Sequence, residues 1–136
     1  MIHEPDERVH HEAIKALVTA AVAPAEIYAH GEVPGIDGNE GDLLLQYVLL
    51  QVERMPLPVL QAPRLSARTS WWVQVRVVDT GVHNCQRLQQ LVIGAVENER
   101  ITLAGHESTP LTFDVAEAAR PDDGRFSAAI SYTYTL

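Results

Sequence analysis

The sequence has few of the residues on which crosslinks, zinc sites and nucleic-acid binding depend. Among its 136 residues there is one cysteine, Cys85, which excludes a disulfide framework within the chain and a zinc site built from several cysteines. Only 10 Lys and Arg residues stand against 18 Asp and Glu residues, which gives a formal net charge of −8. Because binding of the phosphate backbone requires clustered positive charge, this balance argues against a protein that wraps nucleic acid.

Long hydrophobic runs are also missing. The longest apolar stretch, residues 43–52, is interrupted by Gln46 and Gln51 and is too short to cross a bilayer. The first seven residues are polar and acidic, unlike a signal peptide. We therefore expect a soluble protein made in the cytoplasm, with no membrane partner.

No catalytic or metal-binding motif is complete. The segment His11-Glu12-Ala13-Ile14-Lys15 begins like a zinc-protease helix, but Lys15 stands where the second histidine is needed. We expect His10 and His11 to be solvated residues of a first helical turn. The loop 37–42 offers oxygen ligands that superficially suit calcium, but Val48 occupies the position of the bidentate glutamate.

The remaining candidates for chemistry have simpler structural explanations. Asp122 and Asp123 belong to a Pro-Asp-Asp-Gly turn, and Cys85 falls on the apolar stripe of a helix. A Gly-x-Ser-x-Gly nucleophile motif is absent. We therefore predict no catalytic residue, no metal ligand and no cofactor.

Hydrophobic periodicity predicts helices and grouped strands within a single domain, residues 1–136. Helices are expected over residues 6–23, with Asp6 as N-cap, and over residues 82–97, with Thr80 as a candidate cap. Strands are expected over residues 27–29, 43–54, 69–79, 101–103, 111–115 and 126–136. This grouping predicts the α+β class, with an antiparallel or mixed β-sheet and two α-helices packed mainly on one face.

Three of these segments bear on interactions. Strand 43–54 is expected to be buried on both faces, and the alternating strand at the end of the chain is expected to lie at an exposed sheet edge. In strand 69–79, the adjacent Trp71 and Trp72 must point to opposite faces, so one belongs to the core. The other is a candidate anchor at an interface if helices cover only one face, and a second buried residue if the chain covers both faces.

Two loops separate these strands. Residues 31–42 hold four glycines among acidic side chains, and no role for them is apparent. Residues 55–68 contain Pro56, Pro58 and Pro63 together with several leucines, a composition that is too apolar for a free loop and suits insertion against another protein.

Taken in order, these segments resemble the tail terminator proteins of phages with long, non-contractile tails (siphoviruses). The resemblance covers nearly the whole chain and rests on order and spacing. Its segments are the N-terminal helix, the Ile27-Tyr28 strand, Leu45-Gln46-Tyr47-Val48, the Pro-rich excursion, Ser70-Trp71-Trp72-Val73-Gln74-Val75, Cys85-Gln86-Arg87-Leu88-Gln89-Gln90-Leu91 and Arg120-Pro121-Asp122-Asp123-Gly124-Arg125-Phe126 before a Tyr/Thr strand. The glycine-rich loop 31–42 has no counterpart in this pattern.

The resemblance implies a subunit of a six-membered homomeric ring, without catalytic residues. Such a ring caps the tail tube at its final length, binds the tube protein and offers a surface to the head-side connector. Its expected place is the head-proximal end of the virion tail, after synthesis in the host cytoplasm. Genomic DNA would pass through the lumen without specific binding, which an acidic protein permits. A connector or stopper subunit on the head side of the joint is the nearest alternative.

The predicted interface comprises the Pro-rich loop, the second tryptophan and the end of the chain: Leu57, Val59, Leu60, Arg64, Arg68, Trp72, Tyr132 and Tyr134. An alternative of another class is a small cytoplasmic enzyme or ligand-binding domain. Its site would be assembled in space from dispersed residues such as Tyr47, His83, Asp114 and Tyr132.

Overall fold

The structure, a computed structural model, describes residues 7–36, 38–41, 44–55 and 69–136. The elements follow in the order α1 (Glu7–Val22), β1 (Ile27–Ala29), β2 (Tyr47–Arg54), β3 (Ser70–Asp79), α2 (Val82–Val96), β4 (Thr102–Leu103), β5 (His106–Glu107), β6 (Thr112–Asp122) and β7 (Arg125–Thr135). Both predicted helices and the strands at 27–29 and 69–79 are confirmed to within a few residues.

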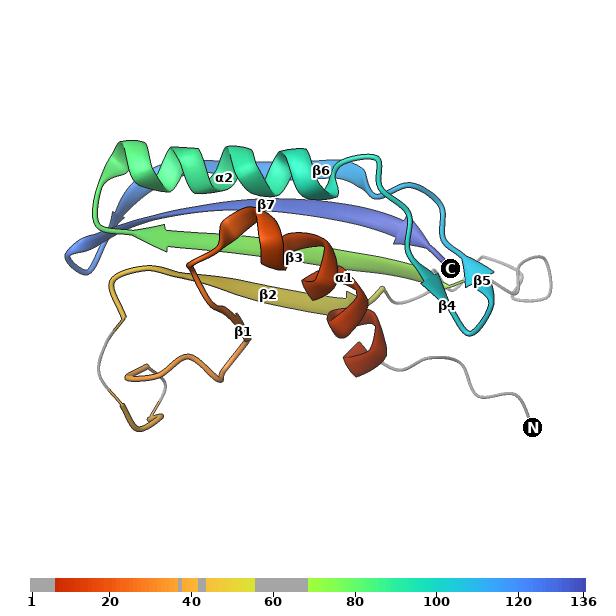
Figure 1. Ribbon diagram of the computed structural model, residues 1–136, viewed down its shortest axis with the longest axis horizontal. Helices are drawn as coiled ribbons and strands as arrows, with labels where there is room; N and C mark the ends of the chain where they lie inside the picture. The colour runs from red at the N-terminus through yellow and green to blue at the C-terminus, as the bar shows by residue number, and fades with distance from the viewer. Residues whose placement is uncertain (1–6, 37, 42–43, 56–68) are drawn as a thin grey trace.

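A five-stranded sheet in the order β1-β2-β3-β7-β6 carries the fold. Strand β1 runs parallel to β2, and the other pairs are antiparallel. Helices α1 and α2 contact each other and pack on the same face of the sheet (Figure 1). The predicted α+β class, with a mixed sheet and two helices on one face, is confirmed.

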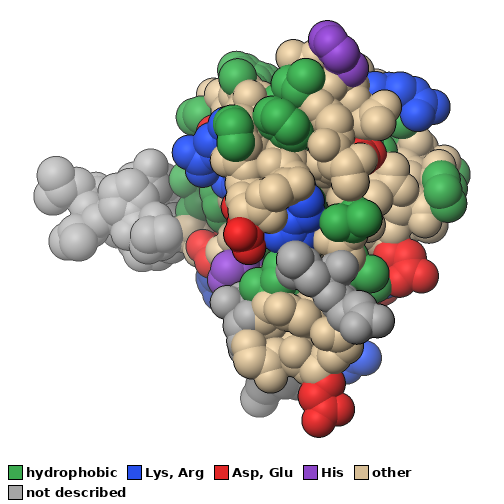
Figure 2. All heavy atoms as spheres, turned by 90° about the vertical axis from the view of Figure 1, so that its left-hand side faces the viewer, with side chains coloured by type: hydrophobic (Ala, Val, Ile, Leu, Met, Phe, Trp, Pro, Cys, Tyr) green, Lys and Arg blue, Asp and Glu red, His purple; other side chains and the backbone are tan. Residues whose placement is uncertain are grey.

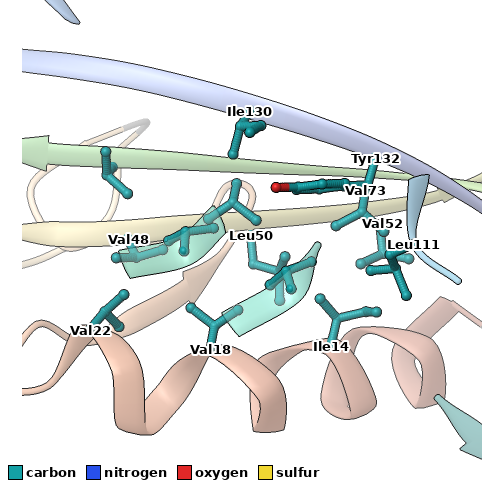
Figure 3. Packing of buried hydrophobic residues seen from close by; sticks show 14 of the residues in the cluster. Ile14, Val18, Val22, Val48, Leu50, Val52, Val73, Leu111, Ile130 and Tyr132 are labelled. Carbon is teal, nitrogen blue, oxygen red and sulfur yellow. The ribbon is translucent and has the colours of Figure 1, made fainter. Parts of the chain in front are cut away.

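The core lies between the two helices and this face, which we call the helix face. Helix α1 contributes Ile14, Val18 and Val22, which lie opposite Leu50 and other β2 residues (Figure 3). Strand β3 alternates as predicted, with Val73 and Val75 buried toward the helices. Each fully buried aliphatic side chain of this kind stabilises the fold by about 1.5–3 kcal/mol.

Strand β2 is shorter than the strand predicted over 43–54, and the prediction that both its faces are buried is wrong. From Val48 onward it alternates, with Val48 and Leu50 buried and Leu49 and Gln51 only partly so. The reason is that both helices lie on one side of the sheet, which leaves the other side of β2 without a helical layer over most of its length.

The cap predicted for the second helix is also wrong. Helix α2 begins after Gly81, an extended residue whose backbone position has no side-chain cap. The hydroxyl and the backbone N–H of Thr80 instead donate to the Asp79 carboxylate, at 3.3 and 2.6 Å. Asp6, the cap predicted for the first helix, lies outside the described residues.

The end of the chain does not form an exposed edge. Strand β7 lies between β3 and β6 and pairs with both, so that Tyr132 has Val73 on one side and Phe113 on the other. The segment predicted as a short strand over 111–115 is the long strand β6, which continues through Pro121 to the turn at Asp123-Gly124. Proline is tolerated there because β6 is an edge strand.

A buried histidine was not expected either. His10 is 1% exposed, its ring stacks on Trp71 with centroids 3.7 Å apart, and its Nδ1 lies 2.6 Å from the Tyr134 hydroxyl. His11 is partly buried, and its Nε2 donates to the Leu50 carbonyl at 3.2 Å. The prediction that both histidines are solvated is therefore wrong.

Candidate functional site

The face of the sheet opposite the helices is the first candidate surface. One end of it is covered by the described residues of the segment 31–46, in which Val33 packs against Tyr47 and Val78 in a small second core with Ile36 and Leu44 beside it. Arg125 anchors this segment, because its Nη1 donates to the Leu44 carbonyl at 2.8 Å and its guanidinium lies 5.6 Å from the Tyr47 ring centroid. Val33, Ile36 and Leu44 thus form a partial second layer on this face.

The remainder of this face carries polar side chains and one tryptophan, and we call it the open face: Gln51, Glu53, Trp72, Gln74, Arg76 and Thr133. Trp72 is partly exposed between Glu53 and Thr133 on the neighbouring strands. It lies six residues along β3 from Val78, roughly 20 Å from the covered end. The prediction that the two tryptophans point to opposite faces is confirmed, since Trp71 is 3% exposed in the core.

The middle of the open face is held by an ion pair that crosses one strand. Arg76 Nη2 on β3 lies 2.6 Å from Glu117 Oε2 on β6, and Ala129 of β7 is the residue between them. The small side chain of Ala129 leaves room for this contact. Glu117 also lies 3.4 Å from Arg120, so its charge is shared between two guanidinium groups.

The outer edge of β6 is a second candidate surface. Phe113 and Val115 are 51% and 56% exposed near its beginning. The pairing of β6 with β7 is interrupted by two β-bulges, one between Phe113 and Ala116 and one between Glu117 and Arg120. At each bulge β6 advances three residues while β7 advances two, so β6 contains one extra residue. Such bulges twist an edge and protect it from indiscriminate pairing. The alternation Phe113-Asp114-Val115 in the sequence could have revealed this exposed pair.

A third candidate is a groove between the polar side of α1 and the edge formed by β1 and β2. It encloses about 920 Å³ and is lined by α1 residues such as Glu12 and Lys15 and by β2 residues from Leu50 to Glu53. Strand β1 pairs only with Val48–Leu50, so the later part of β2 borders the groove directly. Sequence periodicity gave no sign of this groove, because it depends on where β1 stops.

The predicted interface residues have different outcomes. Five of them lie outside the described residues: Leu57, Val59, Leu60, Arg64 and Arg68. Trp72 lies on the open face as predicted. Tyr132 and Tyr134 are 0% and 3% exposed, so the prediction that they face a partner is wrong. The physical reason is that β7 is a central strand and both side chains point toward the helices.

The four dispersed residues considered for a ligand site are not brought together. Tyr132 points into the helix-face core, whereas Asp114 contacts the hydroxyl of the adjacent Ser131, which points to the opposite side of the sheet. Tyr47 is buried against Val33 and Val78, and His83 is exposed on α2 beside Gln86.

Metal-ligating side chains do not gather into a site among the described residues. Within the ranges that the structure describes, no group of three or more His, Cys, Asp or Glu residues could hold a metal ion. None of the helices described there is long and apolar enough to cross a membrane. At the end of the molecule that carries the segment 31–46, described side chains of both charges are scattered among hydrophobic and polar ones (Figure 2).

Comparison with known proteins gives a likeness of structure rather than of sequence. No family model and no curated protein sequence matches the chain. One solved structure, whose description states no function, matches with a TM-score of 0.68 and 12% identity, covering 97% of this chain and 96% of the other. A chain from the virion of a native gene transfer agent particle matches with a TM-score of 0.59 and 17% identity, covering 92% of this chain and 90% of that one. Over 92% of its length, the chain therefore shares its fold with a component of a virion particle.

Proposed function

We propose that this protein is a structural component of a phage-type virion and, more specifically, a ring-forming tail terminator. In this role about six copies close a ring on the tail tube at its final length, and the ring presents a surface to the head-side connector. The protein would be made in the host cytoplasm and would end at the head-proximal end of the tail. DNA would pass through the lumen without specific contacts.

The observation that carries this proposal is the near full-length fold match to a chain of a gene transfer agent virion. The match spans 92% of this chain, so it extends over most of the fold rather than over one common motif. The order of segments by which the sequence resembles tail terminators points to a virion protein as well.

The placement of the candidate surfaces also supports a ring. The groove beside β2 and the exposed residues of β6 lie at opposite edges of one sheet, and the open face lies between them. Two different surfaces on one subunit favour head-to-tail contacts, which generate closed rings when the rotation closes. This arrangement supports a subunit that acts through contacts, and we propose that it is not an enzyme.

Deleting the gene in the phage or particle-producing strain tests the proposal. We expect tails of abnormal length that are not joined to heads, and restoration of normal particles by the intact chain, as seen by electron microscopy. Labelling the chain in restored particles should place it between tube and head. Tails of normal length joined to heads in the deletion strain contradict the proposal, and a label on the head side of the joint assigns the chain to the connector or stopper instead.

Substitution of Trp72 tests the open face. Trp72→Ala should leave the subunit folded, because the side chain is only partly buried. It should weaken assembly by about 30-fold or more, since central tryptophan anchors contribute about 2 kcal/mol or more at interfaces. The measurement is the fraction of complete particles when the variant replaces the intact chain.

Trp72→Phe is the matched control, because it keeps an aromatic anchor on the same face and should restore most particles. Equal yields from Trp72→Ala and the intact chain would show that the open face is not an interface.

A further inference from the structure

The groove beside β2 has an unsatisfied backbone edge. The Val48 N–H donates outward to the Glu26 carbonyl near β1, whereas the Met55 N–H donates inward to the Ser70 carbonyl of β3. Because successive residues of a strand alternate in direction, the N–H and C=O of Leu50 and Val52 also point outward. The His11 side chain binds the Leu50 carbonyl. Within the described part of the chain, no hydrogen bond satisfies the outward groups of Val52.

The groove is also acidic. Its charged lining consists of Glu7, Glu12, Glu32 and Glu53 against Arg8 and Lys15. A segment that enters it should therefore be extended, should offer backbone groups to Val52 and should carry positive charge.

The chain itself contains a segment of this chemistry. Residues 56–68, Pro-Leu-Pro-Val-Leu-Gln-Ala-Pro-Arg-Leu-Ser-Ala-Arg, include two arginines and no acidic residue. Their Pro-x-Pro spacing is typical of segments that bind in extended form. Between Pro58 and Pro63, Val59–Ala62 have four consecutive backbone N–H groups that could pair with an edge.

We propose that the segment 56–68 of one subunit binds in the α1–β2 groove of the next copy, as an added strand beyond the end of β1. This inference rests on the proposed ring function and identifies the contact that would link neighbouring subunits. The arginines Arg64 and Arg68 pair with glutamates of the groove, and the backbone of the segment pairs with Val52.

Local stereochemistry favours the neighbouring copy over the same chain. Met55 and Leu57 each precede a proline, and such residues are biased toward extended conformations. The chain is therefore expected to leave β2 in the direction of the strand. The segment returns to Thr69 beside the end of β2, since the Met55 N–H donates to the Ser70 carbonyl, so it must fold back once in either geometry. Pairing with Val52 of its own β2 would require this reversal directly after Met55, where Met55 and Leu57 disfavour it, whereas a neighbour's groove can receive the segment farther along.

Cysteine crosslinking between two differently tagged full-length chains tests this contact. One chain carries Leu57→Cys, Leu60→Cys or Leu65→Cys, and the other carries Gln51→Cys in the groove. We expect a disulfide-linked dimer with one chain of each kind from at least one of these pairs. The native thiol, Cys85, is buried and should not interfere. Pairing the same loop cysteines with Gln90→Cys, an exposed position on α2, gives the background level.

A chain that carries both the loop cysteine and Gln51→Cys distinguishes the two geometries. Crosslinking within this chain, without dimers, would show that the segment folds onto its own groove and would overturn the inference. Mixed-dimer yields at the background level for every loop position would overturn it as well.

Charge reversal tests the recognition itself. Glu12→Lys with Glu53→Lys should lower the mixed-dimer yield about five- to tenfold, as expected for two solvent-screened ion pairs. Adding Arg64→Glu and Arg68→Glu to the loop partner should restore it. The control pair Glu97→Lys and Glu99→Lys changes the net charge equally at exposed positions outside the groove and should have no effect. Equal loss in the control, or no restoration, contradicts specific pairing.

These outcomes are separable from those of the deletion experiment. Normal tails in the deletion strain would contradict the proposed terminator function, even if purified chains still crosslink through the groove. Complete particles from chains with reversed groove charges would contradict the groove contact and leave the proposed terminator function standing.

Discussion

Replacement of Trp71 by alanine is expected to lower the free energy of unfolding by about 3–5 kcal/mol, the range observed when a buried aromatic side chain is truncated. Trp71 is 3% exposed, and its ring stacks on His10 at 3.7 Å. Its loss removes buried apolar area and leaves a cavity beside a polar ring. The buried pair formed by His10 and Tyr134 then loses the surface that holds the imidazole in place.

Urea or guanidinium denaturation followed by circular dichroism measures this change. The adjacent Trp72→Ala is the matched control, because it removes the same side chain from the partly exposed face and should cost about 1 kcal/mol. A similar loss in both variants would contradict the assignment of one tryptophan to the core and the other to the open face. Together with the assembly test on Trp72→Ala, the two substitutions distinguish an effect on folding, expected for Trp71, from an effect on subunit binding, expected for Trp72.

Much of the fold could be predicted from the sequence because it depends on local periodicity. The alternation of β3 and the apolar stripe of α2 determine which residues face the core, and both are local patterns. The position of β7 could not be derived from alternation, because alternation specifies faces and not neighbouring strands. A different signal was present: residues 126–136 contain no charged side chain, as suits a central strand, whereas β6 contains Asp114, Glu117 and Arg120.

The burial of His10 had a comparable signal. It precedes Ile14, Val18 and Val22 at intervals of four, so it belongs to the buried stripe of α1. A histidine is accepted there only because Trp71 and Tyr134, distant in the sequence, supply a stacking surface and a hydrogen-bonding hydroxyl. The groove also depends on contacts between segments that are distant in the sequence. It exists because β1 pairs with only three residues of β2 and because α1 packs beside the rest of that strand. Sequence alone therefore predicts the layers well and the interaction surfaces only in part.

The protein is expected to lose stability at alkaline pH, with Tyr132 as a main cause. Burial raises the pKa of Tyr132 to about 12, and burial also raises the pKa of Tyr134 above its ordinary value. A tyrosine whose pKa is higher in the folded state stabilises the fold fully below its unfolded pKa of about 10. This stabilisation is lost as the pH rises from about 10 through the folded pKa. For Tyr132 the loss is on the order of 3 kcal/mol, which follows from a pKa of about 12 in the folded state and about 10 in the unfolded state.

Tyr132→Phe isolates this contribution. The Tyr132 hydroxyl is buried without a hydrogen-bond partner in the described part of the chain, so its removal should be neutral or stabilising by about 1 kcal/mol near pH 7. The variant should also unfold less readily between pH 10 and pH 12, as measured by denaturation at fixed pH. Burial raises the pKa of the Cys85 thiol as well, but that group is present in both proteins and cancels in the comparison.

Tyr134→Phe is the matched comparison, because its hydroxyl has a partner. That hydroxyl lies 2.6 Å from His10 Nδ1, so the variant should lose about 1–2 kcal/mol near pH 7 because a buried hydrogen bond is removed. Both variants should reduce the alkaline loss, but only Tyr134→Phe should be destabilised at neutral pH. If Tyr132→Phe were destabilised as strongly, the hydroxyl of Tyr132 would have a partner, and its role in the core would have to be reassigned. The two substitutions remove the same atom from the same strand, so a difference between them reports the hydrogen bond rather than the packing of the ring.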